Sequence, residues 1–356
     1  MSVPSQTPGQ RCEGIRDGRN ESGLQRNARL RIALRVIVFG GTRFIGRAIV
    51  EELAAARHEL LIVHRGNLEP GDLPPVQHLH ADRAELASHR KELAAFRPDA
   101  AIDCRALTRA DSEAALEALP GGLQLVVISS IDVYRAFGAL NEDRETDPIP
   151  LDEDSPVRPN RYPYRGLMPG MDDYDKLDVE EVYLSRAATA VRLPMVYGER
   201  DYQLREEFIL RRLRAGRTRI PFGAGTWLHS GAYVRDVARG VHLVLKTPAA
   251  AGEVLNLCED RTYSIRMWAR MILDAADSDA ELVRVADELL PEDLRPTGTM
   301  SQHIAVSAHK ARSMLGWTTS DPAESLRTTV RWHLANPPPD PNLDFSADDA
   351  ALSGTV

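Results

Sequence analysis

Short apolar runs recur along the chain, and several are followed by a segment whose apolar positions have helical spacing. A continuous apolar run suits a parallel strand covered on both faces, whereas apolar residues three and four positions apart suit an amphipathic helix. The predicted strands are residues 36–39, 60–63, 76–80, 100–104, 123–128 and 188–193. Strands that alternate with helices in this way indicate a parallel α/β sheet with right-handed crossovers.

Helical spacing is clearest at residues 45–56, and further helices are predicted at 92–96, 208–213 and 237–245, with Asp236 as the N-cap of the last. The two ends of the chain lack such spacing. Residues 1–33 are rich in Gly, Ser, Gln, Asn and Arg, and residues 336–356 are acidic and rich in Pro, Ser and Ala. We therefore expect a disordered N-terminal extension at 1–33 and a disordered acidic tail at 336–356.

A glycine-rich turn joins the first predicted strand to the first predicted helix. Gly40 and Gly41 allow a tight turn, and Gly46 lets the helix pack close to the strand. The N-terminus of the helix then presents unpaired N–H groups and a positive dipole to a pyrophosphate. The turn predicts a dinucleotide site, and its candidate cofactor-binding residues are Gly40, Thr42, Arg43, Phe44, Ile45 and Gly46.

The spacing Gly40-x-x-Arg43-x-x-Gly46 resembles the G-x-x-G-x-x-G of the extended short-chain dehydrogenase/reductases, the NAD-dependent epimerase/dehydratase family. Arg43 replaces the middle glycine, so the resemblance is to an atypical branch of that family. It spans about residues 35–332. It implies a Rossmann-type doubly wound parallel sheet of about seven strands with a smaller C-terminal substrate lobe.

The expected domain boundaries follow from this resemblance. Residues 34–196 form the dinucleotide-binding Rossmann domain, and residues 197–335 form mainly the substrate lobe, with segments that return to the Rossmann core. The resemblance also implies a homodimer.

The end of the second predicted strand favours NADP over NAD. An NAD site usually places a carboxylate there for the ribose 2′-hydroxyl, but this chain has His64-Arg65-Gly66. Arg43 and Arg65 together suit a 2′-phosphate, unless both are solvated surface residues. The ends of the later strands and the resemblance supply the other candidate cofactor contacts, which are Asp82, Arg83, Ala106, Leu107, Lys176, Pro194 and Val196.

The fifth predicted strand runs into Ser129-Ser130-Ile131-Asp132-Val133-Tyr134, which resembles the S-S-x-x-V-Y of the same family. The resemblance makes Ser130 the catalytic hydroxyl that polarises the substrate oxygen, whereas a cap of the next turn is its structural alternative. Asp132 matches the glutamate of the acid pair in related dehydratases, where it serves elimination; a carboxylate that only fixes the loop is the alternative. Tyr134 is a candidate substrate contact.

The family's Y-x-x-x-K pair is displaced in this chain. Lys176 and Glu180 have the family's spacing, but Asp172 stands four residues before Lys176 and Tyr174 only two, about 200° around an ideal helix. Three interpretations stay open. Tyr174 reaches the site from an irregular helix start, Tyr162 or Tyr164 enters from the preceding loop, or Asp172 takes the place of the tyrosine.

Two residues of the second half are candidate substrate contacts. Arg235 suits bidentate binding of phosphate, and His229 is either a substrate contact or a structural histidine. The segment Pro194-Met195-Val196-Tyr197-Gly198 resembles the family's nicotinamide-side segment.

Composition narrows the function further. The 356 residues carry a net charge of −8, which opposes nonspecific nucleic-acid binding. Cys12, Cys104 and Cys258 show no paired spacing, so we expect a reduced cytoplasmic protein with no metal ligands. No apolar run approaches the roughly 18 residues that span a bilayer, and no membrane association is expected.

We therefore predict an NAD(P)-dependent epimerase, reductase or dehydratase that acts on a small hydroxylated substrate such as a nucleotide sugar. The displaced tyrosine motivates one alternative, an NAD(P)-binding regulator or scaffold without turnover. The other alternative is an RNA-binding protein, because the chloroplast stem-loop-binding proteins share this atypical branch; the acidic charge opposes it.

Overall fold

The computed structural model of the protein describes residues 33–142 and 144–354. The predicted extension at 1–33, including Cys12, lies outside the described residues apart from Ala33. Cys104 and Cys258 are free thiols. Within the described part of the chain, every helix is too short or too polar to cross a bilayer.

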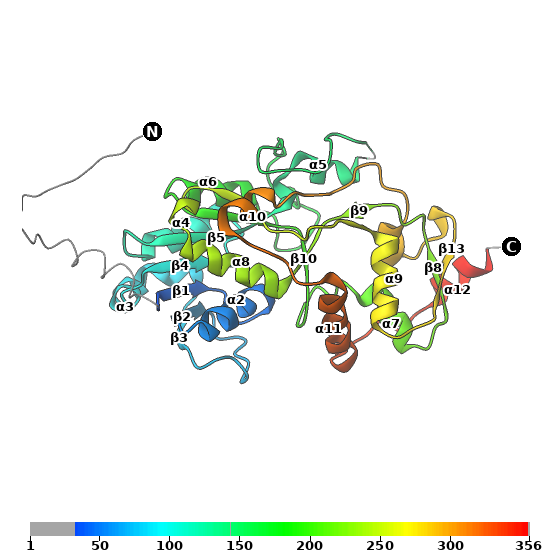
Figure 1. Ribbon diagram of the computed structural model, residues 1–356, viewed down its shortest axis with the longest axis horizontal. Coiled ribbons are helices and arrows are strands. Elements are labelled where there is room, and N and C mark those ends of the chain that lie inside the picture. Colours follow the sequence, from blue (N-terminus) through cyan, green and yellow to red (C-terminus); the bar gives the residue numbers. More distant parts are fainter. Residues whose placement is uncertain (1–32, 143, 355–356) are drawn as a thin grey trace, which may run out of the picture. The chain divides into compact units, whose positions relative to one another are not determined.

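A seven-stranded sheet forms the centre of the fold, in the order β11-β6-β5-β4-β1-β2-β3 (Figure 1). Every neighbouring pair in it is parallel. Its strands are β1 (Arg35–Phe39), β2 (Glu59–His64), β3 (Gln77–His80), β4 (Ala100–Asp103), β5 (Gln124–Ser130), β6 (Thr189–Leu193) and β11 (Val254–Asn256). The predicted Rossmann-type parallel sheet is thus confirmed.

Helices connect the strands of the sheet and build most of the rest of the fold. Those of the first half are α2 (Phe44–Ala55), η1 (Arg83–His89), α3 (Arg90–Ala95), α4 (Arg109–Ala118), η2 (Ile131–Val133), α5 (Arg135–Gly138), η3 (Ala139–Asn141) and α6 (Lys176–Leu184). Those of the second half are α7 (Glu207–Arg214), α8 (Val234–Lys246), η4 (Pro248–Ala250), α9 (Ile265–Ala275), η5 (Asp287–Leu289), η6 (Glu292–Thr297), α10 (His309–Leu315), α11 (Pro322–Ala335) and α12 (Ser346–Ser353).

The two faces of the sheet are covered by different helices. Val36 and Val38 of β1 belong to a buried cluster shared with α2 and α8, which pack side by side (Figure 1). Ile37 and Phe39 of the same strand belong to a second cluster with η1, α3 and α4. Successive side chains of β1 point to opposite faces of the sheet, so this strand contributes to the hydrophobic clusters on both faces, as the unbroken apolar run predicts.

The described residues also form three two-stranded sheets outside the central sheet. The pairs are β7 (Met195–Tyr197) with β10 (Gly231–Tyr233), β9 (Leu228–His229) with β12 (Tyr263–Ser264), and β8 (Arg219–Phe222) with β13 (Glu281–Arg284). The last pair, together with α7, α9, α11 and α12, forms a second group of packed elements, which belongs to the same compact unit as the central sheet (Figure 1). Helix α8 and strand β11 belong to the central sheet and its cover, although they lie late in the chain.

Helix α8 starts earlier than the sequence indicates, with Tyr233 in the N-cap position. Asp236, the predicted cap, lies in the first turn instead. Its buried carboxylate accepts hydrogen bonds from the backbone N and from Oγ of Ser320, both at 2.7 Å. Asp236 therefore holds the distant segment before α11 and does not cap its own helix.

The acidic tail is not disordered throughout, because residues 346–353 form helix α12, which packs on β8. The Asp348 carboxylate is 1% exposed and accepts hydrogen bonds from Nε and Nη2 of Arg212, at 2.7 and 2.8 Å. Arg212 itself is 0% exposed. A tail with few apolar residues is thus ordered by a buried ion pair that hydropathy does not reveal.

Replacement of Asp348 by Ala should lower the free energy of unfolding by about 3 kcal/mol, because the Arg212 guanidinium stays buried with one carboxylate fewer. Asp349 is the matched control, since its ion pair with Arg217 lies at the surface. Asp349→Ala should change the same free energy by less than about 1 kcal/mol. Urea unfolding measures both, and equal effects would show that α12 does not depend on the buried pair.

Candidate dinucleotide and catalytic site

A cavity of about 510 Å³ opens at the carboxyl ends of β1, β2 and β4. Its walls include the glycine turn, the segment after β2, and Arg105 and Leu107 after β4. Tyr202 also lines it, with its ring against Phe44 and Arg43. Ligands of open parallel sheets bind at this edge, outside the carboxyl ends of the strands. The residues that the sequence assigns to the cofactor and that line the cavity are Gly40, Thr42, Arg43, Phe44, Ile45, Gly46, Arg65, Asp82, Arg83 and Leu107.

The glycine turn has the close packing that a pyrophosphate cradle requires. Gly40 has a φ of +83°, and a Cβ on Gly46 would lie 2.0 Å from the carbonyl oxygen of Gly40. A Cβ on Gly41 would lie 2.8 Å from both Ile62 and Val50. Any side chain at Gly46 would force the turn away from the helix, so both sequence spacing and packing demand glycine there.

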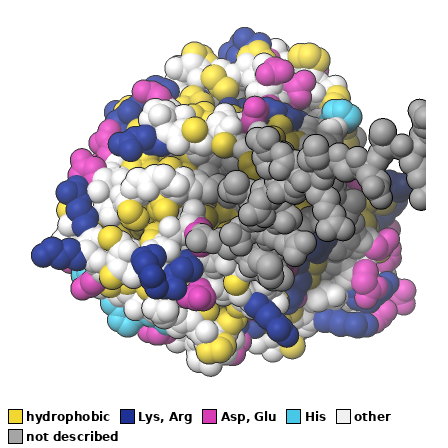
Figure 2. Space-filling view, turned by 60° about the vertical axis from the view of Figure 1, so that its left-hand side comes forward, with side chains coloured by type: hydrophobic (Ala, Val, Ile, Leu, Met, Phe, Trp, Pro, Cys, Tyr) yellow, Lys and Arg dark blue, Asp and Glu magenta, His cyan; other side chains and the backbone are white. Residues whose placement is uncertain are grey.

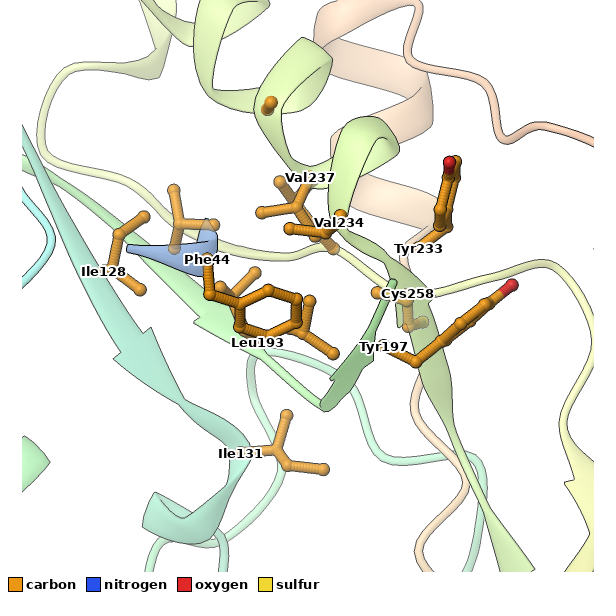
Figure 3. Packing of buried hydrophobic residues seen from close by; sticks show 14 of the residues in the cluster. Phe44, Ile128, Ile131, Leu193, Tyr197, Tyr233, Val234, Val237 and Cys258 are labelled. Atoms are coloured by element: carbon orange, nitrogen blue, oxygen red, sulfur yellow. The ribbon is translucent and has the colours of Figure 1, made fainter. Parts of the chain in front are cut away.

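Helix α2 begins without a side chain cap, so its first-turn N–H groups remain available to an anion. Phe44, its first residue, has a φ of +37° and a buried ring. Figure 3 shows that ring among Ile128, Leu193 and Val234. Packing against β5, β6 and α8 thus fixes the backbone at the point where the phosphates are expected.

Two arginines border the cavity near the end of β2. Arg43 is exposed, with its guanidinium 4.4 Å from the ring centroid of Tyr202. Arg65 is exposed and makes no ion pair with the described residues. Both guanidiniums therefore have N–H donors available for a phosphate. The position after β2, where an NAD site usually has a carboxylate for the ribose 2′-hydroxyl, has no acidic residue.

Arg83 is held by a buried carboxylate, although it also lines the cavity. Its guanidinium donates to both carboxylate oxygens of Asp103 at 2.7 Å and to the carbonyl oxygen of Asp111 at 2.8 Å. Asp82 caps η1 by accepting from the Ala84 N–H at 3.0 Å. Ala106 is fully buried, and its N–H donates to Asp103. Asp82 and Arg83 therefore line the cavity, whereas Ala106 is not among its lining residues. Asp103, which the motifs do not single out, holds both Arg83 and Ala106.

Lys176 is the first residue of α6 and has a fixed position. Its Nζ donates to the carbonyl oxygens of Ala106 at 2.6 Å and Ile128 at 2.9 Å. Asp175 caps the helix, and its carboxylate accepts from the Leu177 N–H at 2.9 Å. Burial lowers the pKa of Lys176 to about 8, opposed by the nearby carboxylates of Asp132 and Asp103. An ammonium has three donors, so one is left for another acceptor.

Tyr174 lies in the irregular segment just before α6, and its phenol meets the end of β5. The hydroxyl donates to Asp132 Oδ2 at 2.7 Å, and the Tyr164 hydroxyl approaches the same oxygen at 3.3 Å. Burial, and then the Asp132 carboxylate, raise the pKa of Tyr174 well above its usual value, while a hydrogen bond with Ser130 lowers it in part. The displaced tyrosine is thus beside Ser130 and Asp132 because the helix starts late.

Asp132 is buried and only partly satisfied. Its Oδ1 has no hydrogen-bond partner among the described residues. Burial raises the pKa of this carboxyl, against the hydrogen bond from Tyr174 and the charge of Arg158. A carboxyl of raised pKa bonded to a phenol is an arrangement that can hold and pass a proton.

Two of the other three candidates for the tyrosine position, Asp172 and Tyr162, lie elsewhere. Asp172 is exposed and accepts from the Gly166 N–H at 2.9 Å. The Tyr162 ring stacks with the Arg165 guanidinium at 4.1 Å. Tyr164, in contrast, joins the pair of Tyr174 and Asp132. Its signal in the sequence is weak, because a tyrosine ten residues before Tyr174 has no motif spacing.

Several residues that match the family's sequence motifs take part in buried hydrogen-bond networks. Glu180 accepts from Ser129 Oγ at 2.6 Å and from Arg192 Nη2 at 2.8 Å. The Tyr134 hydroxyl donates to Asn256 at 2.8 Å, and its side chain is 0% exposed. Tyr134, which the sequence made a substrate contact, therefore lies in the core and cannot reach a ligand without rearrangement.

The remaining substrate candidates lie apart from each other. Arg235, at the start of α8, binds Glu199 Oε1 through Nη2 at 2.9 Å. His229 is partly buried, its buried Nδ1 lacks a partner among the described residues, and desolvation lowers its pKa to about 4. It borders a small cavity next to Met195 and Glu259. Pro194 and Val196 are buried where β6 passes into β7.

The parallel sheet, the glycine turn and the uncapped helix define a Rossmann-type fold, the class in which dinucleotides bind at this edge of the sheet. The sequence profile of the NAD dependent epimerase/dehydratase family matches residues 36–258, and the chain belongs to this family. The resemblance to extended short-chain dehydrogenase/reductases is thereby confirmed.

Individual relatives match to different extents. The chain is 25% identical over 337 residues to the chloroplast stem-loop binding protein of 41 kDa b of Arabidopsis thaliana, covering 90% of this chain and 84% of that one. It is 37% identical over 99 residues to 2′-dehydrokanamycin reductase of Streptomyces kanamyceticus, 28% of each chain. The dTDP-glucose 4,6-dehydratase of Bacillus anthracis, solved with NAD, shares the fold with a TM-score of 0.66 and 17% identity, over 86% of this chain and 98% of that one.

Lys176 should titrate with a midpoint near pH 8 in the folded protein, which ¹³Cε chemical shifts of labelled lysine measure. Since this folded-state pKa lies below the ordinary value of 10.5, stability should rise between these two pH values as the buried ammonium loses its proton. Lys176→Arg assigns the resonance by removing it. A midpoint at 10.5 would contradict the burial of a charged Nζ.

Proposed function

We propose that the protein is an NADP-dependent enzyme that oxidises or reduces a carbon–oxygen centre of a small hydroxylated substrate, a sugar or sugar nucleotide. One observation carries this proposal. The Tyr174 hydroxyl lies 2.7 Å from Asp132 Oδ2, next to Ser130 and in the same part of the fold as Lys176. Such a group of side chains can polarise an oxygen and move its proton, the step that must accompany hydride transfer.

The cofactor site is supported by the fit of the glycine turn. Gly46 leaves the space that the backbone needs, and the uncapped start of α2 offers N–H donors to a pyrophosphate. Bound nicotinamide dinucleotide would supply or accept the hydride. The donor of Lys176 Nζ not used by Ala106 and Ile128 would hold a ribose hydroxyl.

Tyr174 and Asp132 act together in this proposal. In the oxidation direction, Tyr174 accepts the proton of the substrate hydroxyl as its own proton passes to Asp132 Oδ2. In the reduction direction, the same two transfers run in reverse. The raised pKa of Asp132 suits a carboxyl that receives a proton. Ser130 caps η2, since its Oγ accepts from the Asp132 N–H at 3.1 Å, and in this proposal the same hydroxyl also donates its proton to the reacting oxygen.

A preference for NADP follows from the charges around the cavity. Arg65 is exposed and has no ion-pair partner among the described residues, and a carboxylate does not follow β2. A guanidinium binds the 2′-phosphate of NADP with charge-assisted hydrogen bonds, which a 2′-hydroxyl would not form as strongly.

Arg65→Ala should weaken NADPH binding about tenfold or more, since hydrogen bonds to charged groups contribute about 1.5–3 kcal/mol, and should leave NADH binding unchanged. Fluorescence titration with each cofactor measures both affinities. Arg331→Ala, on the exposed face of α11, is the matched control and should change neither. Equal loss of the two affinities would contradict a 2′-phosphate contact.

The substrate class is supported by the relatives. One relative is named a dTDP-glucose 4,6-dehydratase and the other a 2′-dehydrokanamycin reductase. Screening should therefore cover UDP- and dTDP-sugars and sugar ketones. NADPH absorbance reports a net reduction, and NMR of the product reports epimerisation or dehydration, in which the cofactor is regenerated.

With a substrate from this screen, Tyr174→Phe should reduce the rate by about a hundredfold or more, the range of general acid–base catalysis, and keep the NADPH affinity. Asp132→Asn should also slow turnover, because its amide cannot take up the proton. Tyr162→Phe is the control and should retain the wild-type rate, since its ring stacks on Arg165. An unchanged rate in Tyr174→Phe would overturn the assignment. NADPH binding without turnover on any substrate would favour the regulator.

RNA binding is a second candidate because the relative that matches 90% of the chain is named a stem-loop binding protein. Charge opposes it. On the face in Figure 2, basic and acidic side chains of the described residues are interspersed, and the net charge is −8. Gel shifts with a stem-loop RNA at physiological salt distinguish the two candidates, and we expect no shift.

A further inference from the structure

A cluster of three histidines and one glutamate lies at the edge of the central sheet, where β2 and β3 end. His64 and His80 are register partners in these two strands, and His78 lies two residues before His80, on the same face. Glu69 reaches the cluster from the segment that connects the strands. His64 and His78 are partly buried, whereas Glu69 and His80 are exposed.

The potential ligand atoms of these four residues converge on one point. His64 Nε2 lies 2.8 Å from His78 Nδ1, which in turn lies 3.2 Å from Glu69 Oε1. His80 Nε2 lies 3.1 Å from Glu69 Oε2. All four side chains offer an atom within 4.8 Å of every other. A tetrahedral zinc site with Zn–N distances of about 2.0 Å requires ligand separations of about 3.3 Å, so small side chain shifts suffice.

One close contact within the cluster, between His78 and Glu69, has no hydrogen atom between its two polar atoms. The Gly66 N–H donates to His64 Nδ1 at 3.2 Å, so the proton of a neutral His64 is on Nε2. That proton points at His78 Nδ1, which must then accept. His78 Nδ1 and Glu69 Oε1 consequently face each other with lone pairs at 3.2 Å. A cation between them would remove this repulsion.

We propose that His64, Glu69, His78 and His80 bind one divalent transition-metal ion, of the class of Zn²⁺. Three imidazoles and one carboxylate suit a borderline metal better than Ca²⁺ or Mg²⁺, which prefer oxygen ligands. Binding moves the His64 proton to Nδ1 and displaces the Gly66 N–H, and Gly66 lies in an exposed turn. The sequence suggested no metal because the ligands follow no known spacing motif.

The position of the site gives the metal a consequence for the cofactor. His64, Arg65, Asn67 and Leu68 line the large cavity, and Glu69 directly follows them. A metal bound by both His64 and Glu69 would fix this segment at both ends. If the proposed cofactor site is correct, the metal should therefore increase NADPH affinity by ordering Arg65.

Titration of the full chain, freed of metal with a chelator, tests the site directly. We expect Co²⁺ to bind with one equivalent and to give the visible absorption of a tetrahedral complex, which one equivalent of Zn²⁺ abolishes. His80→Ala and Glu69→Gln should each weaken Co²⁺ binding at least tenfold. His309→Ala removes an exposed histidine of α10, outside the cluster, and should bind Co²⁺ like the wild type.

Circular dichroism verifies that each variant is folded, and Glu69→Gln retains the size of an exposed side chain. Three results would each overturn the proposal: a Co²⁺ absorption spectrum of octahedral type alone, unchanged Co²⁺ binding in both cluster variants, or Co²⁺ binding that His309→Ala weakens as much as they do. NADPH titration with and without Zn²⁺ separates the two proposals. Metal binding without any NADPH binding contradicts the cofactor site and leaves the metal site supported. NADPH binding that Zn²⁺ does not alter contradicts the coupling.

Discussion

The candidate site depends most on the hydrogen bonds and the ion pair of one buried carboxylate, that of Asp103 at the carboxyl end of β4. It binds the Arg83 guanidinium and the Tyr183 hydroxyl, and it accepts from the N–H groups of Arg105 and Ala106. Burial by itself would raise the pKa of Asp103, but the Arg83 charge holds this pKa below its usual value. One ionised side chain thereby joins η1, α6 and the turn after β4.

This arrangement determines where Lys176 can lie. The N–H of Ala106 is fixed by Asp103, and the carbonyl oxygen of the same residue accepts from Lys176 Nζ. The backbone of Asp175 is fixed next to it, because its N–H donates to the carbonyl oxygen of Leu107 at 3.0 Å. The turn after β4 thus connects the floor of the cavity to the start of the candidate catalytic helix.

A second network holds the irregular segment before α6. The Arg158 guanidinium is buried against the Asp175 carboxylate, and its Nε donates to the carbonyl oxygen of Asp132 at 3.1 Å. Asp175 also accepts from the Tyr162 N–H at 2.9 Å. Buried pairs of this kind specify one geometry more than they add stability, and here that geometry presents Tyr174 to Asp132 and Ser130.

The sequence by itself determined the order of strands and helices, the parallel sheet and the glycine turn, because these depend on local sterics and on periodicity along a few neighbouring residues. It left the role of the tyrosine open, since the late start of α6 depends on Asp175 and its distant partners. Tertiary packing also decided that Tyr134 and Glu180 enter buried networks and that Asp348 orders the tail. The histidine cluster required the pairing of β2 with β3. Such convergence of distant side chains has no signature in local spacing.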